Sequence, residues 1–288
     1  MLHTPFPARP GGQTAPVTRP VRYRLRQSFR YDYDAPALSL LHRLVVVPPV
    51  RHGDQQLLLG AVRVSDPSAQ VDWHLDGHGN QVCTVRLAVV PEWVDLHVDV
   101  VVERAGEAAP LPADLLDDPR LCAPSWLTTA SPAVRALARE LAGGTVLEVA
   151  DRVGAAVHER VAYVPGSTTV RTTAAQALAG GQGVCQDQAH VALAVLRALG
   201  LPCRYVSGHL VGQGGTHAWL EVLVRDGAGA RAVALDPCHA RRTDERYVTV
   251  AVGRDYLDVP PTSGWYSGGA RGTLTGSREL VRAAPRAA

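Results

Sequence analysis

The sequence contains no lysine, a single methionine and only two phenylalanines among its 288 residues. All 29 basic residues are therefore arginines, and with 27 acidic residues they leave a formal net charge of +2. Such a balanced chain lacks the excess positive charge with which proteins bind a nucleic-acid backbone, so we expect no nucleic-acid partner. Long apolar runs are also missing, since stretches such as 44–47 and 192–196 are far shorter than the roughly 20 residues of a membrane-spanning helix. We expect no membrane partner either.

Cysteine is scarce, and the five thiols are an odd number. The first twenty residues carry five prolines and no apolar segment of the kind found in secretory signal peptides. Both features favour a reduced, cytoplasmic location over a disulfide-bonded secreted protein. Hydrophobic residues still make up 46% of the chain and charged residues 19%, which is enough apolar material for a folded core.

Composition and apolar patterning divide the chain into segments. We expect a flexible proline-rich tail at 1–20, an N-terminal β domain at 21–104, a linker at 105–130, a second domain at 131–282 and a short tail at 283–288. Apolar and polar residues alternate in the first domain, as at 92–100, which is typical of half-buried antiparallel strands. The linker is rich in Ala, Pro and Asp, with few β-branched residues.

The second domain combines helical and strand patterns. Thr145 to Glu148 is a capping box that begins one helix, and another helix is predicted from Cys185 to Leu199, ending at Gly200. After this helix, apolar residues recur at every second position, which predicts strands at 203–211, 217–224 and 231–236. The last two strands are predicted to form a hairpin. The fold class is therefore α+β.

Cys185 is the strongest candidate for chemistry. Glycines precede it, so the backbone there can approach a substrate, and it lies at a predicted helix start, where unpaired N–H groups and the helix dipole favour a thiolate. A thiolate nucleophile needs a base, and the base needs an orienting group. His217 begins one strand of the predicted hairpin and Asp236 ends the other, so antiparallel pairing can bring them together. Each residue alone is more often structural, but their order and element types predict a Cys185–His217–Asp236 triad.

These residues lie in motifs that resemble the bacterial transglutaminase-like superfamily. The motifs are Gly183-Val-Cys-Gln-Asp-Gln-Ala-His190, Thr216-His-Ala-Trp-Leu-Glu221 and Leu235-Asp-Pro237. The β-rich stretch from Tyr23 to Glu103 resembles the N-terminal β domain of one subgroup. The resemblance spans residues 21 to 280 approximately, and it implies a papain-like α+β core that carries the same triad. Where the family commonly has Asp-Pro-Thr and a polar residue, this chain has Cys238 and His239 after the proline, and a tryptophan usual on the preceding strand is missing.

Further site residues are assigned by position. The backbone N–H of Cys185 is one oxyanion donor, and Gln182 or Gln176 is the candidate for the second. Tyr163 and Trp219 are candidates to line the cleft, and Trp265 is expected in the core or the cleft.

Several other residues are assigned no chemistry. Asp187 and His190, near the front of the nucleophile helix, are expected to be structural. Scattered cysteines and histidines, among them Cys203, His209 and His239, could be assembled into a zinc site on paper, but no CxxC or HExxH spacing supports one. We therefore expect no metal and no cofactor.

The predicted activity is acyl transfer from a peptide or protein substrate through a Cys185 thioester, with hydrolysis by a peptidase or amidase preferred. Three alternatives stay open. They are crosslinking by a protein-glutamine gamma-glutamyltransferase, acyl transfer to an arylamine, and a non-catalytic peptide-binding module on the same fold. No calcium-binding loop pattern accompanies the motifs. The sequence does not specify an oligomeric state.

Overall fold

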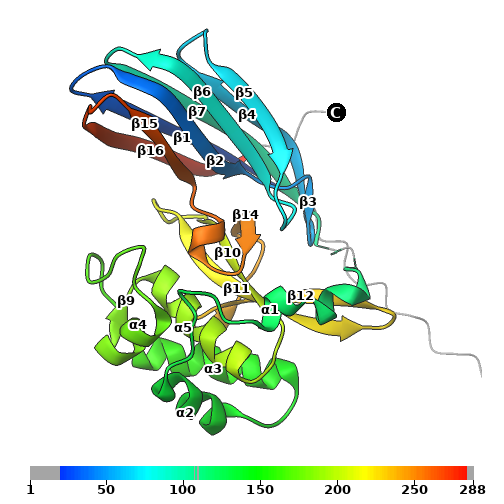
Figure 1. The fold of residues 1–288 in the computed structure, drawn as a ribbon. Coiled ribbons are helices and arrows are strands. Elements are labelled where there is room, and N and C mark those ends of the chain that lie inside the picture. The colour runs from blue at the N-terminus through cyan, green and yellow to red at the C-terminus, as the bar shows by residue number, and fades with distance from the viewer. Residues whose placement is uncertain (1–19, 107, 109, 284–288) are drawn as a thin grey trace, which may run out of the picture.

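The structure is a computed structural model that describes residues 20–106, 108 and 110–283. It has two parts, a β sandwich and an α+β core (Figure 1). The predicted tails at 1–20 and 283–288 lie outside the described residues, apart from Pro20 and Ala283. Within the described part of the chain, no helix is both long enough and apolar enough to cross a membrane.

The β sandwich consists of two antiparallel sheets with the strand orders β16-β1-β7-β4-β3 and β15-β2-β6-β5. Its strands are β1 (Val21–Tyr33), β2 (Ala37–Val47), β3 (Arg51–His52), β4 (Gln55–Val64), β5 (Gln70–Leu75), β6 (Gln81–Val90), β7 (Trp93–Arg104), β15 (Thr262–Ser267) and β16 (Gly272–Ala283). The predicted alternation in β7 is confirmed, because every second residue from Val94 to Val102 is buried. These side chains fill the space between the sheets.

The last two strands belong to the sandwich, which differs from the predicted domain boundary at 282. β16 pairs with β1 along almost its whole length, and β15 pairs with β2. A local apolar pattern identifies a strand but not its partner. Only the folded chain shows that 262–283 return to the N-terminal sheets and cover their edges.

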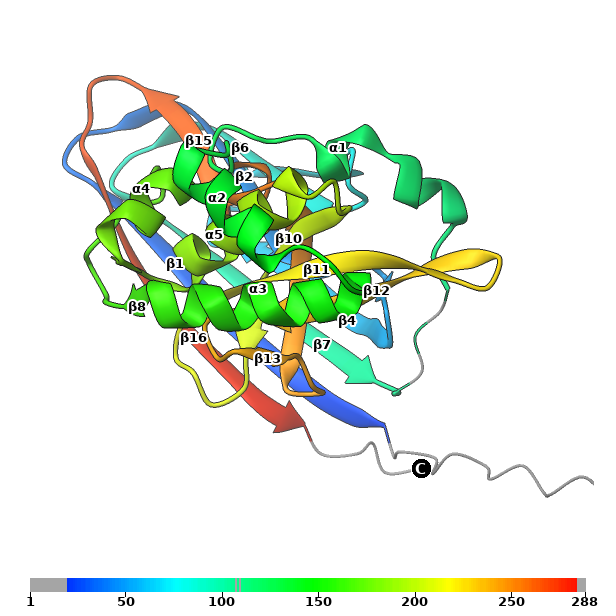
Figure 2. The same cartoon turned by 90° about the horizontal axis from the view of Figure 1, so that it is seen from below.

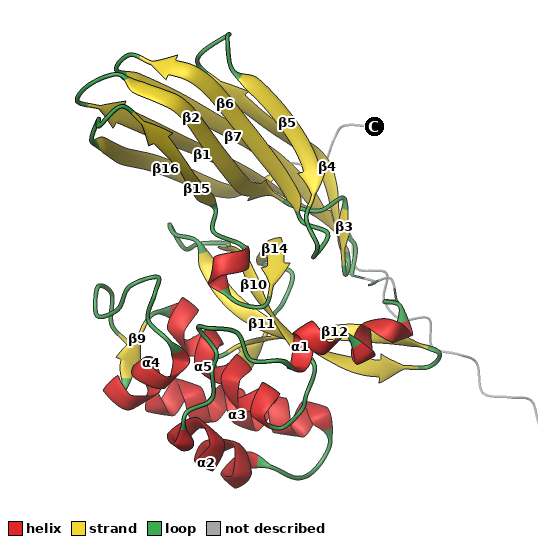
Figure 3. Cartoon of the chain, in the orientation of Figure 1, coloured by secondary structure: helices red, strands yellow, loops and turns green. Residues whose placement is uncertain are grey.

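The core is built on a five-stranded antiparallel sheet with the order β13-β12-β11-β10-β14. Its strands are β10 (Cys203–Leu210), β11 (His217–Asp226), β12 (Gly229–Asp236), β13 (Arg241–Arg242) and β14 (Tyr247–Gly253). The main helices are α2 (Pro132–Leu141), α3 (Val146–Arg160), α4 (Ala174–Gly180) and α5 (Cys185–Ala198), and the short elements are η1 (Ala113–Asp117), α1 (Pro119–Cys122), β8 (Ala162–Tyr163), β9 (Gln182–Gly183) and η2 (Tyr256–Asp258). The helices lie on one side of this sheet and the sandwich on the other (Figures 1 and 3), and Figure 2 shows them covering the sheet from below. The predicted α+β class is confirmed.

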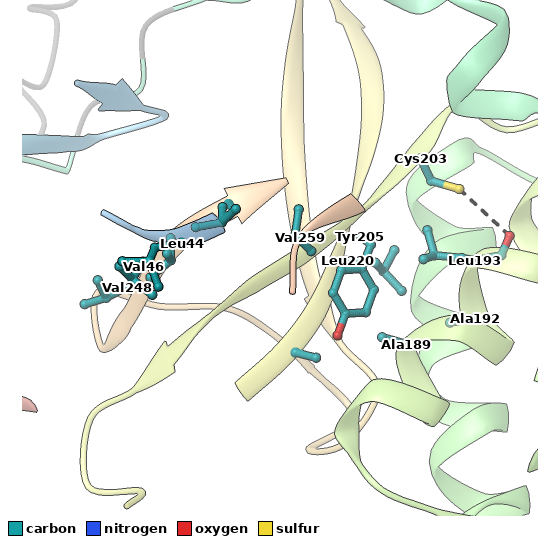
Figure 4. Close-up of a cluster of buried hydrophobic side chains, with 14 of the residues drawn as sticks. Leu44, Val46, Ala189, Ala192, Leu193, Cys203, Tyr205, Leu220, Val248 and Val259 are labelled. Atoms are coloured by element: carbon teal, nitrogen blue, oxygen red, sulfur yellow. Dashed lines mark hydrogen bonds between the residues drawn. The ribbon is translucent and has the colours of Figure 1, made fainter. Parts of the chain in front are cut away.

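Helix α5 is the centre of the core and is buried on nearly all sides. Its Leu193 packs towards Tyr205 and Leu220 of the sheet (Figure 4). Beyond the sheet, Leu44 of β2 lies close to Val248 of β14, so the apolar core continues into the sandwich (Figure 4). Each such fully buried leucine contributes roughly 1.5–3 kcal/mol to folding. The helix that begins at Cys185 is therefore held rigidly.

A buried ionic contact also joins the two parts. The Glu221 carboxylate lies 2.7 Å from His52 Nε2 of the sandwich and 2.7 Å from Arg204 Nε of the core. Burial alone would raise the pKa of Glu221, but these two partners hold that pKa well below its usual range. The contact connects β3 of the sandwich to β10 and β11 of the core.

Candidate active site

Cys185 is the first residue of α5, and the turn before it depends on a glycine. Asp187 Oδ2 accepts hydrogen bonds from the Val184 N–H at 2.8 Å and from Thr168 Oγ1 at 2.6 Å. A β-carbon on Gly183 would lie 2.7 Å from the β-carbon of Asp187, so only glycine fits beneath this cap. Asp187 thus holds the loop, which is the structural role expected of it. The sulfur is left at the positive end of the helix dipole.

His217 and Asp236 come from neighbouring strands. β11 begins at His217 and β12 ends at Asp236. The pairing of Leu220 with Leu235 places these two strand termini at the same end of the sheet. Nε2 of His217 lies 2.7 Å from Oδ2 of Asp236. The two side chains are only 2% and 0% exposed, so the pair is shielded from water. Antiparallel pairing brings the two residues together.

Cys185 interacts with the same imidazole. Burial alone would lower the pKa of His217, but hydrogen bonds to Asp236 and Cys185 outweigh it and raise that pKa to about 9. Because Nε2 is bonded to the aspartate, Nδ1 is the ring nitrogen that this contact leaves free. A thiol that interacts with an oriented imidazole is the arrangement found in cysteine nucleophiles.

The Asp236 carboxylate accepts four hydrogen bonds. Oδ2 lies 2.7 Å from His217 Nε2, His239 Nδ1 and the Tyr247 hydroxyl, and Oδ1 accepts from the Cys238 N–H at 2.9 Å. Burial alone would raise the pKa of Asp236, but its hydrogen bonds, foremost that with His217, lower it to about 2. The carboxylate is therefore ionised at neutral pH, and its orientation is fixed from several directions.

Two family models match this chain. The Transglutaminase-like superfamily model matches residues 135–237, which include Cys185, His217 and Asp236. The Bacterial transglutaminase-like N-terminal region model matches residues 23–103, the first seven strands of the sandwich. This chain belongs to the transglutaminase-like superfamily.

A solved structure has the same two-part architecture. The crystal structure of a candidate cysteine protease from Cytophaga hutchinsonii matches with a TM-score of 0.76 at 19% identity, covering 94% of this chain and 93% of that chain. At this identity the match shows a shared fold, sandwich and core together.

Curated relatives are found among the mycobacteria. An uncharacterized protein of Mycobacterium leprae is 40% identical over 132 residues, which are 42% of this chain and 46% of that protein. An uncharacterized protein of Mycobacterium tuberculosis is 38% identical over 131 residues, which are 41% of this chain and 42% of that protein. Each alignment spans less than half the length of the relative.

Trp219, a candidate to line the cleft of this transglutaminase-like protein, lies behind the histidine instead. It is 1% exposed, and its ring centroid is 6.0 Å from that of His217 at an interplanar angle of 29°. A β-carbon on Gly208 would lie 2.5 Å from the indole, so glycine makes room for it. Trp219 lines a cavity of about 590 Å³ between core and sandwich, and Cys185 is not among the residues around that cavity. Trp265, expected in the core or cleft, is 57% exposed on β15.

The candidates for the second oxyanion donor differ in position. Gln176 Oε1 accepts from the Thr173 N–H at 2.9 Å, so this side chain caps α4. Gln182 is exposed in β9, three residues before Cys185. Tyr163 is 55% exposed, and its backbone pairs with Gly183. Partial burial, foremost, and the charge of the neighbouring Cys185 raise the pKa of Tyr163.

The suggested metal ligands are not gathered into one cluster. Cys203 is buried against α5, and His209 Nε2 lies 3.1 Å from Gln27 Nε2 in the interface with the sandwich. His217, Asp236 and His239 do lie together. Their N···O distances of 2.7 Å are those of hydrogen bonds, since ligands of a tetrahedral Zn²⁺ would be roughly 3.3 Å apart.

The sequence analysis missed two side chains that bind Asp236. Tyr247 begins β14, and no local pattern distinguishes it from any other buried tyrosine. His239 was considered as a metal ligand and as part of a departure from the family pattern, but not as a partner of Asp236. The departure from the usual Asp-Pro-Thr was the signal that could have drawn attention to it, because a histidine three residues after an aspartate can turn back to bind it.

Proposed function

We propose that this transglutaminase-like protein is a cysteine-dependent acyl-transfer enzyme. The Cys185 thiolate attacks an amide or peptide carbonyl, the His217 imidazolium protonates the leaving amine, and a thioester acyl-enzyme forms. Asp236 holds the imidazole and stabilises its charge. The observation that carries the proposal is the buried His217–Asp236 pair, whose imidazole also reaches the thiol at a helix start.

We further propose that water is the usual acceptor, so that the reaction is peptide or amide hydrolysis, in the cytoplasm. Cys185 is only partly buried, and the neighbouring Tyr163 and Gln182 are exposed. Water can therefore reach a thioester at this position. Crosslinking would require a site that excludes water and holds a second amine.

The first test is selective alkylation of the native protein with iodoacetamide at pH 6, followed by peptide mass spectrometry. An ordinary thiol with a pKa of about 8.5 is almost wholly protonated at this pH and reacts slowly. We expect rapid labelling confined to Cys185, and loss of that labelling in His217→Ala. Slow labelling spread over several cysteines would contradict an ion-paired nucleophile.

The second test is turnover of a peptide-amide library, with and without an added primary amine. Cys185→Ala should abolish turnover, His217→Ala should cost nearly as much, and Asp236→Asn should cost less than either. Cys122→Ala is the matched control, because this cysteine is also partly buried but lies in α1. Equal turnover in wild type and Cys185→Ala would refute the enzyme proposal. Products that carry the added amine in preference to water would replace hydrolysis by transfer.

A further inference from the structure

Asp236 binds two histidines through one oxygen atom. His217 Nε2 and His239 Nδ1 each lie 2.7 Å from Oδ2, and the two ring centroids are 5.3 Å apart at an interplanar angle of 59°. The proposed mechanism uses the first of these histidines and leaves the second unexplained.

The surroundings of His239 define its hydrogen bonds. Its Nε2 lies 3.2 Å from the side-chain nitrogen of Gln213, which can only donate, so Nε2 accepts and the proton of the neutral ring is on Nδ1. That proton is donated to Asp236. The His239 side chain is 32% exposed, whereas the His217 side chain is 2% exposed. The outer histidine is therefore more accessible to water than the inner one.

Four other ionisable groups lie around the two histidines and Asp236. They are Cys185 of α5, Tyr247 of β14, His209 of β10 and Cys238 of the turn after β12. Arg241 contacts Tyr247 and not the carboxylate itself, with its nitrogens 3.1 Å and 3.2 Å from the Tyr247 hydroxyl. Burial lowers the pKa of His209 to about 4, and burial raises the pKa of Cys238 to about 12, so both are neutral around pH 7. His239 is therefore the second cation-forming group that contacts the Asp236 carboxylate directly.

We propose that His239 is a positioning residue that shares the Asp236 carboxylate with His217 and thereby makes the His217 imidazolium a stronger acid towards the leaving amine. The inference rests on the proposed acyl-transfer function. A general acid works best when its pKa is close to the working pH. An imidazolium that is strongly stabilised by a full carboxylate charge is a weak acid and donates its proton slowly. An additional donor on the same oxygen, beside the Tyr247 hydroxyl, reduces the negative charge that His217 experiences.

The direction of the effect is the same in both protonation states of His239. A neutral His239 withdraws charge from Oδ2 through its hydrogen bond. A protonated His239 adds a positive charge close to His217. Either way, removal of His239 should make the His217 imidazolium hold its proton more tightly. A residue that merely kept Asp236 in place would act in the opposite direction, because a loosened carboxylate would stabilise the imidazolium less.

The test compares wild type with His239→Phe, which fills the space and donates no hydrogen bond, and His239→Asn, which offers an amide donor that never ionises. The readout is the alkylation rate of Cys185 by iodoacetate as a function of pH. This anion is attracted by the imidazolium, so the rate falls when His217 loses its proton. The part of the pH–rate profile in which the rate falls is called the falling limb. We expect its midpoint to move up by roughly half to one pH unit in His239→Phe and by less in His239→Asn. His158→Ala, which removes an exposed histidine of α3, should leave the limb unchanged.

Turnover supplies a second readout. In His239→Phe, kcat for an alkyl amide should fall roughly threefold relative to kcat for an anilide, with KM unchanged, because the poorer leaving group depends more on a strong acid. A limb that moves down, or stays in place in His239→Phe, would overturn the inference. If His239→Phe does not fold, the same limb in His239→Asn decides. Because alkylation needs no substrate, the shift can be observed even if no turnover is found, which separates this inference from the proposed function.

Discussion

Replacing Asp236 by asparagine should move the pH at which His217 loses its proton. The wild-type pKa of His217 is raised from 6.5 to about 9 against the effect of burial, through Asp236 and Cys185 together. An opposite charge in direct contact shifts a pKa by about 1–3 units, so we assign roughly 2 units to the aspartate. At about 1.4 kcal/mol per unit, this amounts to about 3 kcal/mol of imidazolium stabilisation. The side chain is 2% exposed, so little of this value is lost to solvent screening.

The assay is again the pH dependence of Cys185 alkylation by iodoacetate. His217 has a raised pKa, so its imidazolium, and the ion pair that this cation forms with Asp236, is present below that pKa and is lost as the pH rises through it. The falling limb should lie near pH 9 in wild type and near pH 7 in Asp236→Asn. Circular dichroism of the variant serves as the folding control. A folded Asp236→Asn variant with its limb still near pH 9 would refute the assignment of the aspartate as the charge that stabilises His217.

Two further predictions concern the framework around the site. Glu221→Gln should lower the free energy of unfolding by about 3 kcal/mol, because it leaves the Arg204 guanidinium without its counter-charge in a buried interface. An unchanged midpoint of urea unfolding would show that the contact is dispensable. Gly183→Ala should displace Asp187 from the helix cap and cost about 1–3 kcal/mol together with most of the thiol alkylation rate. Gly180→Ala is its control, since a β-carbon there meets nothing within 4 Å, and equal losses in both variants would exclude a specific role for the cap.

Much of the local structure could be predicted from the sequence. The capping box at Thr145 and Glu148 is present, α5 begins at Cys185, and the chain leaves α5 at Gly200, which has a φ of 72°. The hairpin of β11 and β12 is also where the period-two pattern placed it. Helix caps and apolar periods depend on residues a few positions apart, so a single sequence is enough to reveal them.

The site was only partly predictable, because its remaining contacts join distant segments. Alternation along β11 puts Trp219 on the same face as His217, but only the tertiary structure shows that the sandwich covers this face and removes Trp219 from the cleft. The sequence by itself determined which elements carry the nucleophile, the histidine and the aspartate. The tertiary structure decided that β15 and β16 close the sandwich and that Tyr247 and His239 converge on one carboxylate oxygen. Strand pairing and side-chain hydrogen bonds depend on which distant segments meet, and that is settled by packing of the whole chain.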